Sequence, residues 1–329
     1  ESLLAEFPES QHSAEALTAL ALIAQASGDH QLSQQRWARL TKEYPNSEGA
    51  AYSELSRADE LAQTGKVEEA RTLYYQIIQN SPPGSKFAGE AMDKLSVINT
   101  SYLFSAVPNE WNQLVQIQKG DSLMKLAYKY KTTANFIAKA NGRDLNWSLV
   151  PNQRITVPTI ESYRIVVDKD DLHLYLYTGS GKFIKRYLVG IGRMDHLTPP
   201  GQYVIWHKLK SPVWHDRDTG RIVKPDSPDY PLGTRWMTIS PASNPEAFSR
   251  LGIHGTNEPE TIGQRASDGC VRMSNEESEE LFIIVPKGTP VEIVQKRPAP
   301  QDSGSQPQQS QPSPLQDWLE PRIQGEATG

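Results

Sequence analysis

The chain has 329 residues, of which 37% are hydrophobic, and a formal net charge of −5. This length predicts two or three domains, and the mildly acidic balance gives no reason to expect a nucleic-acid partner or an anionic membrane surface. No apolar run reaches the roughly eighteen residues that a membrane-spanning helix needs. The sequence begins at Glu1 without a methionine, so no signal peptide or lipid anchor is visible in it.

The first hundred residues or so repeat with a period of 37. The residues that punctuate the region recur at this spacing: Pro8, Pro45 and Pro82, and Gly28 and Gly65. Each unit reads as an alanine-rich helix, a glycine turn, a second amphipathic helix and a loop that contains proline, which helix interiors exclude. This pattern resembles tetratricopeptide-type repeats, which we assign to residues 1–98.

The third repeat is incomplete, and helical repeats bury their apolar faces against their neighbours. We therefore expect an apolar edge near its end. The expected cover is the module that follows, residues upstream of Glu1, or a partner. Two interpretations of the repeats remain open, a helical spacer and a concave surface that docks another protein.

A second module is predicted over 113–158, after a connector over 96–112. Val115 begins a short alternating strand, the chain turns at Gly120-Asp121, and Ser122 suits the N-cap of a helix. A second helix is expected over 133–141 and a closing strand over 154–158.

This order of strand, helix, helix and strand, with its turn built from Gly120, Asp121, Ser122 and Leu123, resembles a LysM domain. The resemblance implies a shallow groove that binds glycans containing N-acetylglucosamine. Its lining is the turn at 120–123 and, more loosely, the segment 146–152. A small structural adapter is the alternative.

The only cysteine, Cys270, follows Gly269 in the run Ser267-Asp268-Gly269-Cys270-Val271-Arg272. A lone cysteine forms no intrachain disulfide and cannot build a thiolate zinc site. Arg272 favours the thiolate, and His254, sixteen residues upstream, can take the thiol proton. The setting favours a nucleophile over a packing residue. The other histidines of this region show no metal-ligand spacing, so no metal site is predicted.

Three strings of this region resemble the catalytic core of the YkuD-type L,D-transpeptidases: Pro231–Trp236, Leu251–Asn257 and Ser267–Met273. Two further strings match the family's threonine-proline turn and first hairpin: Thr198–Tyr203, and Ile165–Asp168 with Leu172–Tyr177. The resemblance covers 160–296. One departure is Asp268, where many members carry a second histidine.

Alternating apolar runs and glycine or proline turns predict a β-rich catalytic domain, a sandwich or a curled sheet. The whole chain is then a multidomain α+β protein. The resemblance implies that the Cys270 thiolate attacks a peptidoglycan stem tetrapeptide, releases D-alanine and forms a thioester. An amine of a second stem resolves the thioester into a 3→3 cross-link. No cofactor is implied.

The family also implies roles for individual residues. His254 is the general base, oriented by the carbonyl of Gly255. Backbone N–H groups of Gly269 and Cys270 are expected to hold the oxyanion. Arg272 either holds a stem carboxylate or braces the loop, and Ser267 bonds either the loop or the substrate. Asp268 affects substrate recognition in a way that the sequence leaves open, and Trp236 is expected to pack beneath the cleft.

Two other classes of function remain open. One is a hydrolase with water as the acceptor, either an L,D-carboxypeptidase or an enzyme that detaches proteins from the wall. The other is a peptidoglycan-binding scaffold with an idle catalytic domain. All three classes imply a location in the cell envelope, in the periplasm or on the wall, where the helical repeats could dock an envelope protein. The proline, glutamine and serine content of 297–329 predicts a disordered tail.

Overall fold

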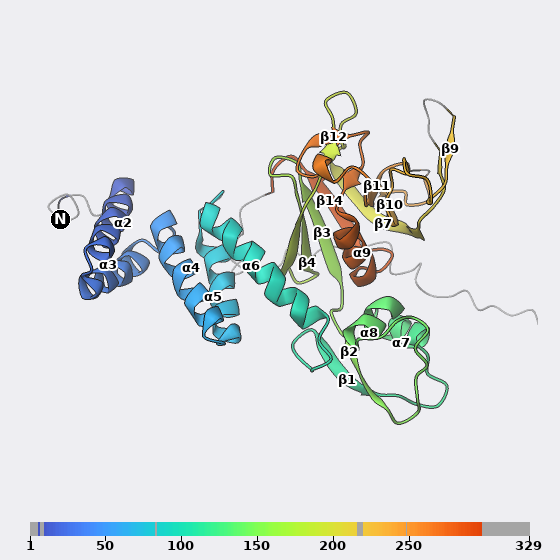
Figure 1. Ribbon diagram of the computed structural model, residues 1–329, viewed down its shortest axis with the longest axis horizontal. Coiled ribbons are helices and arrows are strands. Elements are labelled where there is room, and N and C mark those ends of the chain that lie inside the picture. The colour runs from blue at the N-terminus through green and yellow to red at the C-terminus, as the bar shows by residue number, and fades with distance from the viewer. Residues whose placement is uncertain (1–5, 7–9, 83, 216–219, 248, 298–329) are drawn as a thin grey trace, which may run out of the picture.

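The computed structural model describes residues 6, 10–82, 84–215, 220–247 and 249–297. Helices at the N-terminal end lead to a small module of two strands and two helices and to a larger domain built on a sheet (Figure 1). The predicted multidomain α+β class is confirmed. Apart from Arg297, the tail predicted over 297–329 lies outside the described residues.

From residue 10 onward, the described part of the N-terminal region forms five helices, namely α2 (Gln11–Ala26), α3 (His30–Glu43), α4 (Glu48–Gln63), α5 (Val67–Asn80) and α6 (Lys86–Leu103). Serine side chains cap the first helix of each repeat, since Ser10, Ser47 and Ser85 each accept a backbone N–H of the following turn. Gly28 and Gly65 turn the chain at positive φ between paired helices. The predicted alternation of helices and turns is found, and the tetratricopeptide-type assignment stays a prediction.

The connector predicted over 96–112 is wrong in its first half, because α6 continues to Leu103. The extra turns carry α6 onto the catalytic sheet, where it packs on β5 (Phe183–Leu188). Tyr175, Tyr177 and Phe183 of the sheet share one buried cluster with side chains of α4, α5 and α6. The apolar edge of the third repeat is therefore covered by the catalytic domain, which was not among the covers that we expected.

Polar side chains complete this junction. Asn99 Nδ2 donates to the carbonyl oxygen of Ile184 at 2.8 Å, and the hydroxyl of Tyr75 donates to the carbonyl oxygen of Phe183 at 2.8 Å. Arg186 makes a two-pronged ion pair with Asp93, at 2.6 and 2.7 Å. Because β5 lies at the edge of its sheet, its outer carbonyls would otherwise be open to pairing with another chain.

The second module pairs β1 (Asn112–Gln116) with β2 (Arg154–Pro158) in antiparallel register around α7 (Leu123–Lys129) and α8 (Ala134–Ala140). These elements match the predicted strand, helix, helix and strand. Asn141, at the end of α8, clasps β2 by donating to the carbonyl of Thr156 at 2.7 Å and accepting its N–H at 2.9 Å. The module has its own apolar core.

The catalytic domain is built on a curved eight-stranded sheet of order β13-β11-β10-β7-β14-β3-β4-β5 (Figure 1). The other strands of the sheet are β3 (Tyr163–Asp168), β4 (His173–Thr178), β7 (Gly201–Lys210), β10 (Arg235–Pro241), β11 (Gly252–His254), β13 (Val271–Arg272) and β14 (Pro290–Val294). Short pairs lie outside it: β6 (Ile191–Gly192) with β12 (Arg265–Ser267), and β8 (Trp214–His215) with β9 (Ile222–Val223). The 3₁₀ turn η1 spans Pro259–Thr261. The predicted hairpin is found as β3 and β4.

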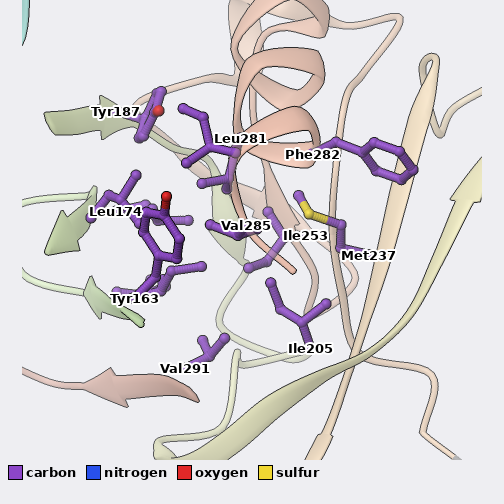
Figure 2. Close-up of a cluster of buried hydrophobic side chains, with 14 of the residues drawn as sticks. Tyr163, Leu174, Tyr187, Ile205, Met237, Ile253, Leu281, Phe282, Val285 and Val291 are labelled. Carbon is purple, nitrogen blue, oxygen red and sulfur yellow. The ribbon is translucent and has the colours of Figure 1, made fainter. Parts of the chain in front are cut away.

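One helix of this domain, α9 (Asn275–Ile284), was not predicted. Ser274 caps its first turn, which also carries two acidic side chains. Leu281 and Phe282 of α9 meet Ile253, Met237 and other strand residues in the core (Figure 2).

Helix α8 of the small module packs against α9 (Figure 1). Phe136 of α8 is fully buried and joins the catalytic core together with Leu103 and Trp111. The hydroxyl of Thr133 donates to the carbonyl oxygen of Ile283 near the C-terminal end of α9. The three parts of the chain are thus joined by apolar contacts as well as by their linkers.

Candidate active site

Strands β11 and β13 bring the two central motifs together. They pair in parallel, with Ile253 opposite Val271 and His254 opposite Arg272. Partners across a parallel pair project to the same face of the sheet, and alternate residues of one strand share a face. Cys270, which immediately precedes β13, therefore lies beside the strand that carries His254. Its side chain is partly exposed, and Sγ lies 3.6 Å from the carbonyl oxygen of Arg250.

His254 is buried, with 4% of its surface exposed, and its Nδ1 lies 2.5 Å from the carbonyl oxygen of Gly255. This is the contact that the family resemblance implies. A carbonyl oxygen can only accept, so Nδ1 carries the proton in the neutral ring, and Nε2 keeps its lone pair. The indole of Trp236 stacks on the imidazole. The ring is thus fixed in one tautomer and one orientation.

Burial lowers the pKa of His254 to about 4, against a partial upward effect of the Gly255 hydrogen bond and a further lowering by the charge of Arg272. Desolvation disfavours the charged form of an imidazole, which explains the direction. The ring is accordingly neutral at neutral pH and able to accept a proton at Nε2.

The loop after His254 is held by Asn275, the first residue of α9. Its Nδ2 donates to the carbonyl of Thr256 at 3.0 Å. A β-carbon on Gly255 would lie 2.1 Å from Asn275 Oδ1, and one on Gly233 would lie 2.0 Å from the same atom. Only glycine fits at these two positions. We had not predicted Asn275, because nothing in its local sequence marks the long-range contact.

The turn before Cys270 is closed by Ser267. Its hydroxyl donates to the carbonyl of Cys270 at 2.6 Å and accepts the N–H of Gly269 at 3.2 Å. Of the two roles expected for Ser267, the structure shows the one in which its hydroxyl bonds to the backbone of the loop. The N–H of Gly269 thus has a partner within the loop, and its expected place in the oxyanion site stays a prediction.

Thr198 anchors the same turn from outside. Its buried hydroxyl accepts the N–H of Gly192 at 2.8 Å and donates to the carbonyl of Gly269 at 2.8 Å. The sequence showed the threonine-proline turn, but the motif alone did not reveal that it fastens the cysteine loop.

Arg272 contacts protein groups. Its Nη1 lies 2.7 Å from a carboxylate oxygen of Glu258 and 3.4 Å from the hydroxyl of Thr261, and only 14% of its side chain is exposed. Of the two roles expected for Arg272, the structure shows the one in which its side chain braces the loop. Asp268 is 64% exposed and pairs with Arg193, Oδ1 to Nη2 at 2.9 Å.

In the small module, Gly120 turns the chain at φ +91° and Asp121 accepts the N–H of Gln118 at 2.8 Å. Ser122 caps α7, whereas Leu123 is buried in the module's core. The second segment expected at the glycan groove lies alongside, because the N–H of Asn152 donates to the carbonyl of Ile117 at 2.8 Å. Three of the four predicted turn residues thus shape the turn, and the fourth packs beneath it.

Across the residues that the structure describes, no three metal-ligating side chains gather in a way that could hold an ion. The same residues include no helix with the length and apolar content to cross a membrane.

Residues 162–293 match the family model of the YkuD-type L,D-transpeptidase catalytic domain, and residues 115–158 match that of the LysM domain. The chain is 30% identical over 185 residues to the L,D-transpeptidase YkuD of Bacillus licheniformis, a match that covers 55% of this chain and 98% of the relative. It is 29% identical over 183 residues to YkuD of Bacillus subtilis, across 54% of this chain and 96% of that protein. Both resemblances read from the motifs are confirmed.

Among solved structures, the catalytic domain of an E. faecium L,D-transpeptidase aligns with 41% of this chain and 98% of its own length. The sequence identity is 27% and the TM-score 0.33.

Proposed function

The chain belongs to the L,D-transpeptidase family, and from that premise we propose that it forms 3→3 cross-links in peptidoglycan through a thioester on Cys270. The observation that carries the proposal is the placement of the only thiol beside a buried, neutral histidine whose Nδ1 is held by a backbone carbonyl. This leaves one basic nitrogen next to one nucleophile.

In the first step, Nε2 of His254 takes the thiol proton and the sulfur attacks the carbonyl carbon of the L,D amide in a tetrapeptide stem. The C–S bond forms, the C–N bond breaks, and the imidazolium returns its proton to the leaving D-alanine amine. Acid–base catalysis of this kind is worth roughly 10²–10⁴ in rate. The charge on the tetrahedral oxygen needs a donor. We assign the N–H of Cys270 to that role, since Gly269 already donates to Ser267.

In the second step, an amine of another stem attacks the thioester. The new C–N bond replaces the C–S bond, and the amine's proton returns to the sulfur through His254. Water in place of the amine would give a tripeptide and no cross-link. Cys270 is partly exposed, so the acceptor has direct access to the reacting carbon.

The LysM module is proposed to bind N-acetylglucosamine-containing glycan at the turn 120–123. Its helix α8 packs on α9, whose first residue, Asn275, holds the loop of His254. A glycan bound there would keep its stems near the cleft. A substrate of this kind implies a site of action in the cell envelope.

The test is incubation with tetrapeptide-rich peptidoglycan followed by mass analysis of the digested muropeptides. Tetrapeptide–tripeptide dimers with a 3→3 linkage are expected from the native chain and not from Cys270→Ala. Tripeptides without dimers would establish the hydrolase instead. Neither product, in a chain that binds peptidoglycan, would establish the idle scaffold.

A further inference from the structure

A cluster of charged side chains lies beside the cysteine turn and takes no part in the steps above. Arg193 bridges two carboxylates, with Nε 2.9 Å from Asp195 Oδ1 and Nη2 2.9 Å from Asp268 Oδ1. His196 Nδ1 lies 3.4 Å from the same oxygen of Asp195. Asp268 is two residues from Cys270 in the chain, so the cluster stands at the edge of the reacting centre.

The backbone holds this cluster in place. Strands β6 and β12 pair Gly192 with Ser267, and the N–H of Arg193 donates to the carbonyl of Ser267 at 3.0 Å. A β-carbon on Gly192 would lie 2.1 Å from the carbonyl oxygen of His196, so glycine permits a tight loop. Through Thr198, the end of that loop is bonded to Gly269. The charged loop and the nucleophile turn therefore form one rigid unit.

The ion pairs of the cluster are open to solvent. The side chain of Arg193 is 45% exposed, and that of Asp268 is 64% exposed. Exposed pairs contribute little to stability, so exchanging one partner for a ligand costs little. The planar guanidinium of Arg193 can bind a carboxylate through two parallel N–H groups. Asp195 and Asp268 together carry one negative charge more than Arg193 neutralises, so they attract a cation.

A ligand that carries an ammonium and a carboxylate on one carbon can pair with both sides of such a cluster. It exchanges the pair between Arg193 and Asp268 for two new ion pairs, and the net charge of the cluster does not change. Acceptor amines of the second step differ in whether the carbon that bears the amine also bears a carboxylate. In a diaminopimelate stem the carbon of the side-chain amine also bears a carboxylate, whereas in a lysine stem it bears none.

We propose that Arg193 and Asp268 select an acceptor whose reacting amine lies on a carboxylate-bearing carbon, as in diaminopimelate. The inference rests on the proposed transpeptidation. Asp268 receives the ammonium and Arg193 the adjacent carboxylate. The ammonium loses one proton to solvent, and the neutral amine then attacks the thioester. The C–N bond forms and the C–S bond breaks. One of the two amine protons reaches the sulfur through His254, and the other stays on the new amide nitrogen.

The experiment supplies one tetrapeptide donor with two competing acceptor tripeptides, which differ only in whether the side-chain carboxyl of diaminopimelate is free or amidated. Mass spectrometry gives the ratio of the two cross-linked products. The proteins are the native chain, Arg193→Gln, Asp268→Asn and the control Arg39→Gln. The control removes an exposed arginine that is paired with Glu43 at 2.9 Å in α3, far along the chain from Cys270.

We expect the native chain and the control to favour the free carboxyl by about fivefold, because amidation removes the one exposed charge contact with Arg193. Arg193→Gln should bring the ratio close to one, and Asp268→Asn should lower cross-linking with both acceptors relative to hydrolysis. Adduct formation with a carbapenem, which needs no acceptor, measures acylation separately.

A native ratio near one in an enzyme that does form cross-links overturns the inference and leaves the proposed function standing. So does a variant in which carbapenem acylation falls as much as cross-linking, since the cluster would then act on the donor. Absence of both acylation and cross-links in the native chain refutes the proposed function itself.

Discussion

The indole ring of Trp236 stacks on the imidazole of His254, with ring centroids 5.1 Å apart and planes inclined by 24°. Gly252 lies against the six-membered ring of the indole, where a β-carbon would approach Cζ2 to 2.6 Å. The stack covers one face of the imidazole and contributes to the burial that lowers its pKa. Trp236 therefore belongs to the environment of the proposed base, and its expected place beneath the cleft stays a prediction.

Cys270→Ala should abolish covalent modification by a carbapenem, whose strained amide stands in for the stem amide. The native chain is expected to gain the mass of one carbapenem in intact-protein mass spectrometry, because it has one thiol. A comparable mass gain in the alanine variant would contradict the assignment of the nucleophile.

His254→Ala should slow carbapenem acylation by at least about 10², since the thiol then loses its base. In the native chain the acid limb of the acylation rate should lie near pH 4, not near 6.5. The folded-state pKa of His254 is lowered to about 4, so the neutral ring persists until the pH falls through that value. Rates measured from pH 3.5 to 8 test this. A tenfold or smaller loss in the alanine variant would require a different base.

Gly255→Ala should weaken acylation and lower stability, because its β-carbon would lie 2.1 Å from Asn275 Oδ1 and must displace the loop that orients His254. Gly89→Ala is a matched control on α6, where the nearest foreign atoms are flexible arginine nitrogens at 3.5 Å. The double variant Gly255→Ala/Asn275→Ala should recover part of the acylation rate, measured by mass spectrometry. No recovery would show that the clash is not the cause.

Asn99→Ala should destabilise the chain by about 1–3 kcal/mol, as expected when buried polar partners are left unpaired. The variant strips the carbonyl of Ile184 on β5 and the guanidinium of Arg71 of a hydrogen bond each. Ser101→Ala, which removes an exposed hydroxyl on the same helix, is the control. Urea unfolding of both variants gives the difference. Equal stabilities would mean that the helices and the sheet are not coupled at this junction.

This junction also changes how the modules can be separated. If the modules were independent, residues 1–158 could be removed with little loss of turnover on soluble muropeptides. Their removal would strip α6 from β5 and expose Tyr175 and Phe183 of the catalytic sheet. Point variants in the LysM turn therefore test targeting more cleanly than deletions do.

The sequence by itself determined the family and the order of the modules. The string around Cys270, the His254-Gly255 pair and the LysM turn are local, and each is specified by a few adjacent residues whose types are dictated by reactivity or by backbone geometry. Strand and helix boundaries of the LysM module followed from alternation and from the cap at Ser122.

Only the tertiary structure decided which of these groups form hydrogen bonds or ion pairs within the protein, and which residues surround them. Glu258 pairs with Arg272, and Asn275 holds the loop after His254 through the carbonyl of Thr256, although these partners lie 14 and 19 residues apart. The cover of β5 by α6 joins residues more than eighty positions apart. Such contacts depend on the path of the whole chain and leave no periodic trace in a local window, so only the folded arrangement specifies them.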